Sequence, residues 1–204
     1  MNDVLARPPL TDASLPAFAG VALRPVVPRD ILNLRGNADE PAFVDAVTSA
    51  LGCPPPVTPN TWAAGEGLQL LWTGPDEWLA VVEPDGPAGR LEAVRGALGT
   101  TRAAVTALSA GYATLELTGE RSRAVLARGT PLDLHVRQFG AGQCAQTRLG
   151  HGSVVLWAQD GVPTFRLMIR RSMAGYLRDW LAAVARRMES RDGAAATPPP
   201  PPVA

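Results

Sequence analysis

The sequence lacks lysine, is poor in charged residues, and has no long apolar run. All 19 basic residues are arginine, and 19 acidic residues balance them. The balance gives no basic excess for nucleic-acid binding and no acidic block of the kind found in solvated tails. Charged residues make up only 19% of the chain, against about 25% in an average protein. This shortage predicts that part of the surface is covered by another molecule.

Further absences restrict the class of protein. No stretch approaches the ~18 uninterrupted apolar residues of a membrane span. Met1–Leu10 contains Asp3 and no apolar segment typical of a secretory signal, so we expect a cytoplasmic protein. Two cysteines, Cys53 and Cys144, are too few for a disulfide framework or a zinc cluster. The absence of lysine fits a GC-rich coding bias, and it also fits an interface, where arginine is favoured over lysine.

The distribution of prolines and apolar residues predicts one folded domain. Residues 1–20 show no steady period and are expected to form a flexible arm. Residues 190–204 contain the proline run Pro198–Pro202 and are expected to be a disordered Ala/Pro-rich tail. Residues 21–189 lie between them and are predicted to form a single α+β domain without internal repeats.

Within this domain the apolar period alternates between two, typical of strands, and about 3.6, typical of helices. Strands are predicted at 21–27, 31–35, 68–72, 78–83, 103–108, 112–117, 145–149, 153–157 and 164–169. Helices are predicted at 40–51 with Asp39 as its cap, at 91–98, at 121–128, and at 172–184 with Ser172 as its cap. Strand pairs separated by helices indicate mixed or antiparallel sheets with packed helices.

Few residues are suited to catalysis. His135 and His151 have no ligand-type partner at helical spacing, and structural or solvent-facing roles are favoured for both. Gly140–Ala145 fits the Gly-x-Gly-x-x-Ala dinucleotide pattern, but a strand rather than a helix is predicted to follow it, so we reject that site. Cys144 is expected to be an inert thiol. No catalytic, cofactor-binding or metal-binding residue is therefore assigned.

Two arginines introduce the last predicted helix. Arg170 and Arg171 precede Ser172 at the helix N-terminus, where the helix dipole disfavours positive charge. Compensation could come from an internal acid such as Asp133, or from acids or a phosphate on a partner; solvent-exposed arginines without a role remain an alternative. We predict that Arg170, Arg171 and one of the five tryptophans, Trp78, contact a partner protein.

The order of several motifs resembles the gamma subunit family of heterotetrameric sarcosine oxidase. The resemblance covers about residues 30–185. It is carried by Leu34-Arg35-Gly36, Leu51-Gly52, Pro59-Asn60-Thr61, Leu71-Trp72-Thr73-Gly74-Pro75-Asp76-Glu77-Trp78-Leu79, Leu115-Glu116-Leu117-Thr118-Gly119, Val125 to Leu134, Phe139, Gly142 to Leu149, and Arg170 to Leu181.

The resemblance implies a fold similar to the folate-binding module of the glycine-cleavage aminomethyltransferases. It also implies a small non-catalytic subunit without a cofactor of its own, assembled with alpha, beta and delta subunits. In that family the complex oxidises sarcosine to glycine and passes the one-carbon unit to tetrahydrofolate. FAD, FMN, NAD and tetrahydrofolate are expected on the partner subunits, across an apolar interface with arginine and aromatic anchors.

Two other functions remain open at this point. A related complex that oxidises another N-methyl amino acid would use a similar small chain. A free-standing folate-binding one-carbon protein would need a carboxylate deep in a pocket to hold the pterin, and Asp133 and Glu116 are the candidates in strand-like context. A third hypothesis, a cluster-maintenance factor, would require chemistry at Cys144.

Overall fold

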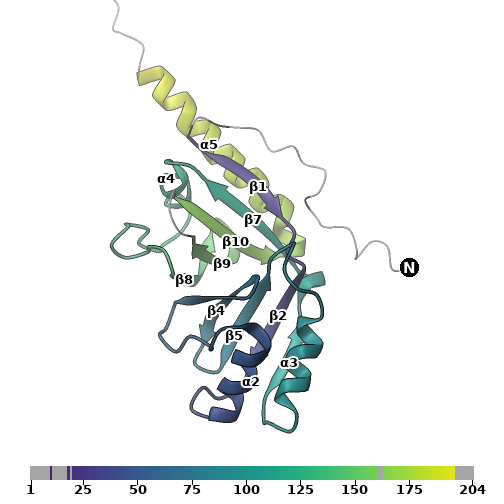
Figure 1. The fold of residues 1–204 in the computed structure, drawn as a ribbon. Coiled ribbons are helices and arrows are strands. Elements are labelled where there is room, and N and C mark those ends of the chain that lie inside the picture. Colours follow the sequence, from purple (N-terminus) through teal and green to yellow (C-terminus); the bar gives the residue numbers. More distant parts are fainter. Residues whose placement is uncertain (1–9, 11–17, 19, 160–162, 196–204) are drawn as a thin grey trace, which may run out of the picture.

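The chain forms two five-stranded antiparallel sheets that pack face to face. The computed structural model describes residue 10, residue 18, residues 20–159 and residues 163–195 (Figure 1). Sheet I has the strand order β1 (Ala22–Val26), β7 (Tyr112–Thr118), β10 (Thr164–Arg170), β9 (Gly152–Ala158) and β8 (Cys144–Leu149). Sheet II has the order β3 (Trp62–Gly65), β4 (Leu68–Gly74), β5 (Glu77–Val82), β2 (Asp30–Arg35) and β6 (Ala104–Ala107).

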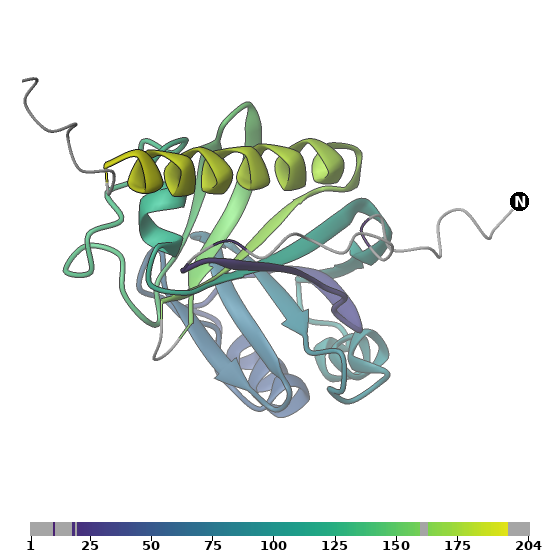
Figure 2. The same ribbon diagram turned by 90° about the horizontal axis from the view of Figure 1, so that it is seen from above.

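Helices cover the outer face of each sheet, so the molecule has four layers. Helices α2 (Pro41–Leu51) and α3 (Arg90–Leu98) lie on sheet II, whereas α4 (Ser122–Leu126) and the long α5 (Ala174–Ala195) lie on sheet I (Figure 2). Short 3₁₀ turns at Ser109–Gly111 and Arg171–Met173 precede β7 and α5. The fold is therefore α+β, as the alternation of periods predicts.

Alternation along the strands builds three apolar layers. In sheet I, Leu115 and Leu167 face the helices, whereas Met168 and Trp157 face sheet II. Because side chains of a strand point alternately to its two faces, each sheet contributes to a helix-covered core and to the core between the sheets. The middle core is composed of Ile31, Leu71, Leu79, Val81, Cys144, Val155, Trp157 and Met168.

Several sequence predictions need correction. The strand β3 was not predicted, because its residues Trp-Ala-Ala-Gly are too few and too small to show alternation. Helix α2 begins after Glu40 rather than Asp39, and neither α2 nor the 3₁₀ turn before α5 has a side-chain cap. The helix predicted at 121–128 is confined to α4. Helix α5 extends to Ala195, past the predicted domain end at residue 189.

Most of the predicted arm and the end of the predicted tail lie outside the described residues. Three residues of the arm are described, and two of them, Leu10 and Phe18, pack on sheet I. Leu10 is buried in the core beneath α5, and Phe18 forms an isolated antiparallel bridge with Val21. This part of the segment 1–20 therefore belongs to the core rather than to a flexible arm.

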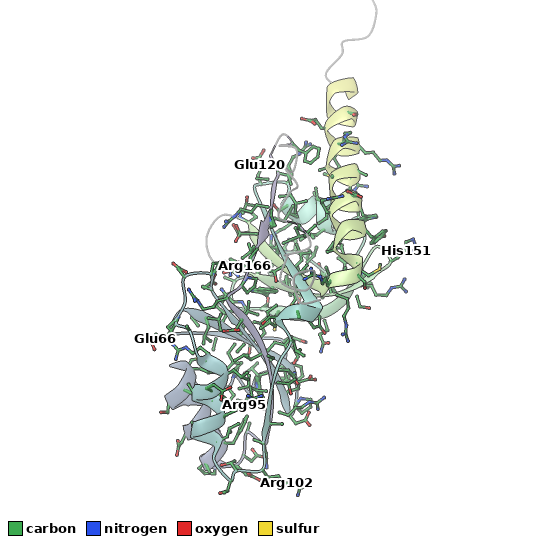
Figure 3. The ribbon with its side chains drawn as sticks, turned by 90° about the vertical axis from the view of Figure 1, so that its right-hand side faces the viewer. Glu66, Arg95, Arg102, Glu120, His151 and Arg166 are labelled. Carbon is green, nitrogen blue, oxygen red and sulfur yellow. The ribbon has the colours of Figure 1, made fainter. Side chains whose placement is uncertain are left out.

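A largely buried arginine connects the two sheets. Arg166 of β10 lies at their junction (Figure 3) and its Nε donates to Glu116 Oε2 of β7 at 3.1 Å, within sheet I. Its Nη1 donates to Glu83, which directly follows β5, and to Gln69 Oε1 of β4 at 3.3 Å. Gln69 Oε1 also accepts the indole N–H of Trp157 at 2.8 Å. The contacts to Glu83 and Gln69 both cross the gap between the sheets.

The carboxylate of Glu116 is held from two sides. It receives Arg166 on one oxygen and Arg24 of β1 on the other, with Arg24 Nε at 2.7 Å. Burial disfavours the charged form of Arg166, but hydrogen bonds and charges from Glu83 and Glu116 outweigh burial and raise the pKa of Arg166. Two arginines and two glutamates therefore neutralise one another, and we interpret the cluster as structural.

The two arginines that share Glu116 differ in exposure, and this difference predicts that their removal lowers the free energy of unfolding by different amounts. The Arg166 side chain is 12% exposed, whereas that of Arg24 is 65% exposed. We expect Arg166→Met to destabilise the full chain by about 3 kcal/mol, because it leaves Glu116 and Glu83 without their buried partner. Arg24→Met is expected to cost under about 1 kcal/mol, as for other exposed ion pairs. Denaturant unfolding measures both, and equal costs would contradict the structural role of Arg166.

Both cysteines are free and buried. The Cys144 thiol lies in the core between the sheets and donates to Thr61 O at 3.2 Å and to Trp72 O at 3.4 Å. Burial raises the pKa of Cys144 to about 12 and raises that of Cys53 as well. A raised thiol pKa keeps the reactive thiolate scarce near neutral pH.

The two thiols are therefore expected to be unreactive in the folded chain at mildly alkaline pH. A colorimetric thiol reagent should detect neither until the pH approaches the raised values or the chain is unfolded, when both should react. Cys53→Ala serves as the control that assigns any native signal to Cys144. Prompt modification of Cys144 in the folded chain would contradict this prediction and would support the hypothesis in which this thiol performs chemistry.

Candidate functional site

The inner face of sheet I emerges from beneath sheet II and forms a recess of about 580 Å³. Successive rows across the sheet show the transition. The row of Glu116, Arg166, Trp157 and Cys144 is buried or nearly so against sheet II. Four residues further along each strand, the row of Tyr112, Arg170, Ser153 and Arg148 is largely exposed and lines the recess.

The recess is cationic. Its lining consists of Tyr112, Pro131, Gln146, Thr147, Arg148, Ser153, Val154, Val155, Met168 and Arg170. No aspartate or glutamate is among these ten residues, and the guanidinium of Arg170 lies over the ring of Tyr112 at 5.0 Å from its centre. Since neighbouring strands are about 4.8 Å apart, Arg148 on β8 and Arg170 on β10 flank Ser153 on β9 with roughly 10 Å between their backbones. Arginines at this spacing suit carboxylates, which they bind with paired hydrogen bonds.

The structure places the three predicted partner-contact residues differently. Arg170 lines the recess, and Arg171 follows it at the start of the 3₁₀ turn, partly exposed. Trp78 is a correction: its side chain is fully buried beneath α2, where it packs on Phe43 with 5.4 Å between ring centres. Its indole N–H donates to Pro56 O at 2.8 Å. A side chain with no exposed surface cannot contact a partner in this fold.

The acids considered from the sequence do not line the recess. Asp133 accepts a hydrogen bond from the backbone N–H of His135 in an exposed turn, and Glu116 is held by its two arginines. Neither carboxylate is therefore placed to hold a pterin in this hollow. His151 lies in an exposed turn beside α5, with its ring 6.0 Å from that of Tyr176 (Figure 3). The segment 140–145 leads into strand β8 rather than into a helix, in agreement with the rejection of a dinucleotide site.

Large apolar side chains are rarely exposed in the part of the chain that is described. The exposed ones are Val27, Val57 and Val136, which lie in three separate loops. The apolar interface expected from the resemblance is thus not visible as a patch on the described surface. Arginine and tyrosine in the recess provide a polar alternative.

Arg148 was missed by the sequence reasoning. It stands alone in its strand, without a neighbouring cation or a helix terminus to draw attention to it. Only the pairing of β8 with β9 and of β9 with β10 brings it into the same hollow as Arg170. The available signal was the alternation Cys144, Gln146, Arg148, which places these three residues on one face of a strand.

The described residues contain neither a membrane-spanning helix nor a cluster of metal-binding side chains. None of their helices is long and apolar enough to cross a membrane. No group of three or more histidine, cysteine, aspartate or glutamate side chains in the described ranges is arranged to hold a metal ion.

Comparison with known proteins identifies relatives of the chain. One is the sarcosine oxidase subunit gamma of Corynebacterium sp. (strain U-96), 37% identical over 115 residues. The match covers 56% of this chain and 55% of that protein, so it spans about half the length of the relative.

Solved structures show the same fold. A chain of the heterotetrameric sarcosine oxidase from Corynebacterium sp. U-96, in complex with pyrrole 2-carboxylate, matches with a TM-score of 0.80 and 28% identity. The match covers 90% of this chain and 96% of that one. The glycine cleavage system aminomethyltransferase T from Bartonella henselae matches with a TM-score of 0.63 and 15% identity, over 79% of this chain and 45% of that one, which is a likeness of fold.

The family assignment covers most of the domain. The model of the sarcosine oxidase, gamma subunit family matches residues 35–186. This range contains the recess and all strands of both sheets apart from β1 and all but the last residue of β2. The chain therefore belongs to the sarcosine oxidase gamma subunit family.

Proposed function

We propose that the chain is a non-catalytic structural subunit of a heterotetrameric sarcosine oxidase. The complex oxidises sarcosine to glycine and transfers the one-carbon unit to tetrahydrofolate. FAD, FMN, NAD and tetrahydrofolate are held by the partner alpha, beta and delta subunits, and this chain contributes a binding surface that includes Arg170 and Arg171.

The composition of the recess is the observation that carries this proposal. The ionisable groups that line it are Arg148, Arg170 and Tyr112, which suit the binding of an acidic surface. General acid–base catalysis instead uses groups that titrate near the working pH, such as histidine or a perturbed carboxylate. The four charges of the cluster around Arg166 neutralise one another, and the Arg166–Glu83 pair joins the two sheets. These features support a role in assembly.

Native purification of the tagged full chain from its own host tests the proposal. We expect larger subunits with visible flavin absorbance to be recovered with it, together with peroxide production that depends on sarcosine. The separated chain should be colourless and inactive. Mass spectrometry identifies the subunits, and an unrelated tagged protein from the same host serves as the control. Recovery of a lone, colourless monomer would overturn the proposal, and titration with tetrahydrofolate would then be the next measurement.

Charge reversal at Arg171 separates a role in assembly from a role in chemistry. We expect Arg171→Glu to lower the yield of assembled complex, because it places a negative charge beside the proposed contact. The turnover number per assembled complex should stay at the wild-type value. Full assembly combined with lowered turnover would contradict the proposed role of Arg171. Arg187→Glu, at an exposed position of α5, is the matched control.

A further inference from the structure

One strand, β10, holds two arginines on the same face in opposite electrostatic environments. Arg166 is surrounded by Glu83 and Glu116 and is nearly buried. Arg170, four residues further along, lies over Tyr112 in a recess whose lining contains no carboxylate. Arg148 adds a second positive charge to the same hollow. The counter-charge that completes the row at Arg166 is thus lacking from the lining at Arg170.

The lining also provides neutral polar groups and an apolar floor. Gln146 and Ser153 can hydrogen-bond an incoming carboxylate, and Val155 and Met168 form apolar surface next to them. The Thr147 side chain lies on the opposite face of β8, where its hydroxyl contacts that of Thr130 at 3.0 Å. The side-chain amide of Gln146 already donates to Thr73 O at 2.6 Å, which fixes its orientation at the border with sheet II. Arginine, tyrosine and methionine are enriched at protein interfaces, whereas the few exposed apolar residues lie elsewhere.

The border of the recess coincides with a short open edge of sheet I. Ala158 N–H donates to Gln143 O, and Cys144 N–H donates to Asn60 O on the opposite side. Because backbone groups of alternate residues point to the same side of a strand, those of Gln146 and Arg148 also point away from β9. No described residue forms a backbone hydrogen bond with them on that side. Open edges of this kind accept an additional extended segment.

We propose that an extended, carboxylate-bearing segment of a partner subunit binds at the edge of β8 and places an acidic side chain in the recess, between Arg148 and Arg170. This inference rests on the proposed function, because it requires a partner subunit. It names the chemistry of the contact: charge-assisted hydrogen bonds to two arginines, with backbone pairing at Gln146 and Arg148. The contact is polar, so its strength depends on ionic strength.

Capture of co-expressed subunits by the tagged full chain, at low and at high salt, tests the inference. The variants are Arg148→Glu, Arg170→Glu and their combination. We expect the double variant to weaken assembly by roughly 30-fold or more at low salt, as for the loss of paired charges at an interface. The neutral pair Arg148→Gln with Arg170→Gln should lie between the double variant and wild type, and should lose most of the salt dependence. Arg187→Glu should assemble as wild type.

Two further measurements keep the outcomes separate. Thermal unfolding of each variant identifies a misfolded chain. If the charge-reversed double variant is misfolded, the capture of subunits by the neutral pair, Arg148→Gln with Arg170→Gln, tests the inference in its place. In the assembled complex the backbone amides of Gln146 and Arg148 should exchange slowly with solvent. Wild-type assembly by the double charge-reversed variant, or fast exchange at both amides, overturns the inference and leaves the proposed function intact. Failure of the wild-type chain to capture any subunit overturns both.

Discussion

The position of Arg166 determines how the two sheets meet. Its guanidinium contacts Glu116 within sheet I and Glu83 and Gln69 of sheet II, so three strands and one strand end converge on one cation. A buried charge must be paired and hydrogen-bonded. This requirement fixes the distance and the register between the sheets where the apolar contacts alone would permit sliding. Gln69 extends the same network to Trp157 and Gln159. Hydrogen bonds therefore orient the side chains that border the core between the sheets on this side.

The recess follows from the same arrangement. Since sheet II contacts the row that contains Arg166, the row that contains Arg170 extends beyond it and stays open. Two arginines on one face of β10, Arg166 and Arg170, therefore have different roles. The difference follows from sheet II, which covers Arg166 and does not reach Arg170. The cation inside the sandwich is neutralised by the chain's own glutamates. The cations outside it, Arg148 and Arg170, line a recess without a carboxylate of its own, which is why we propose a partner's carboxylate as their ligand.

The sequence predicted the elements better than their assembly. Alternation located nine of the ten strands, since leucine, valine and isoleucine recur at every second position, and failed for β3, whose small residues carry no such signal. Arg170 was found because it stands next to Arg171 at the start of a helix, a local cue. Arg148 was not found, since its significance depends on strand pairing across the sheet. Trp78 was misjudged for the same reason: tryptophan is frequent both in interfaces and in cores, and only the packing of α2 on β5 distinguishes the two.

The described surface has few exposed large apolar residues, so the proposed assembly cannot depend on apolar burial alone. Val27, Val57 and Val136 lie in separate loops, so their combined burial would not form a continuous patch. Charge is then the stronger determinant on the described surface. Paired hydrogen bonds from arginine are directional, and an unpaired carboxylate buried against the wrong surface is costly, so such a contact favours one partner over others. A cationic recess bordered by an open sheet edge thus provides specificity in a subunit that has little apolar surface to offer.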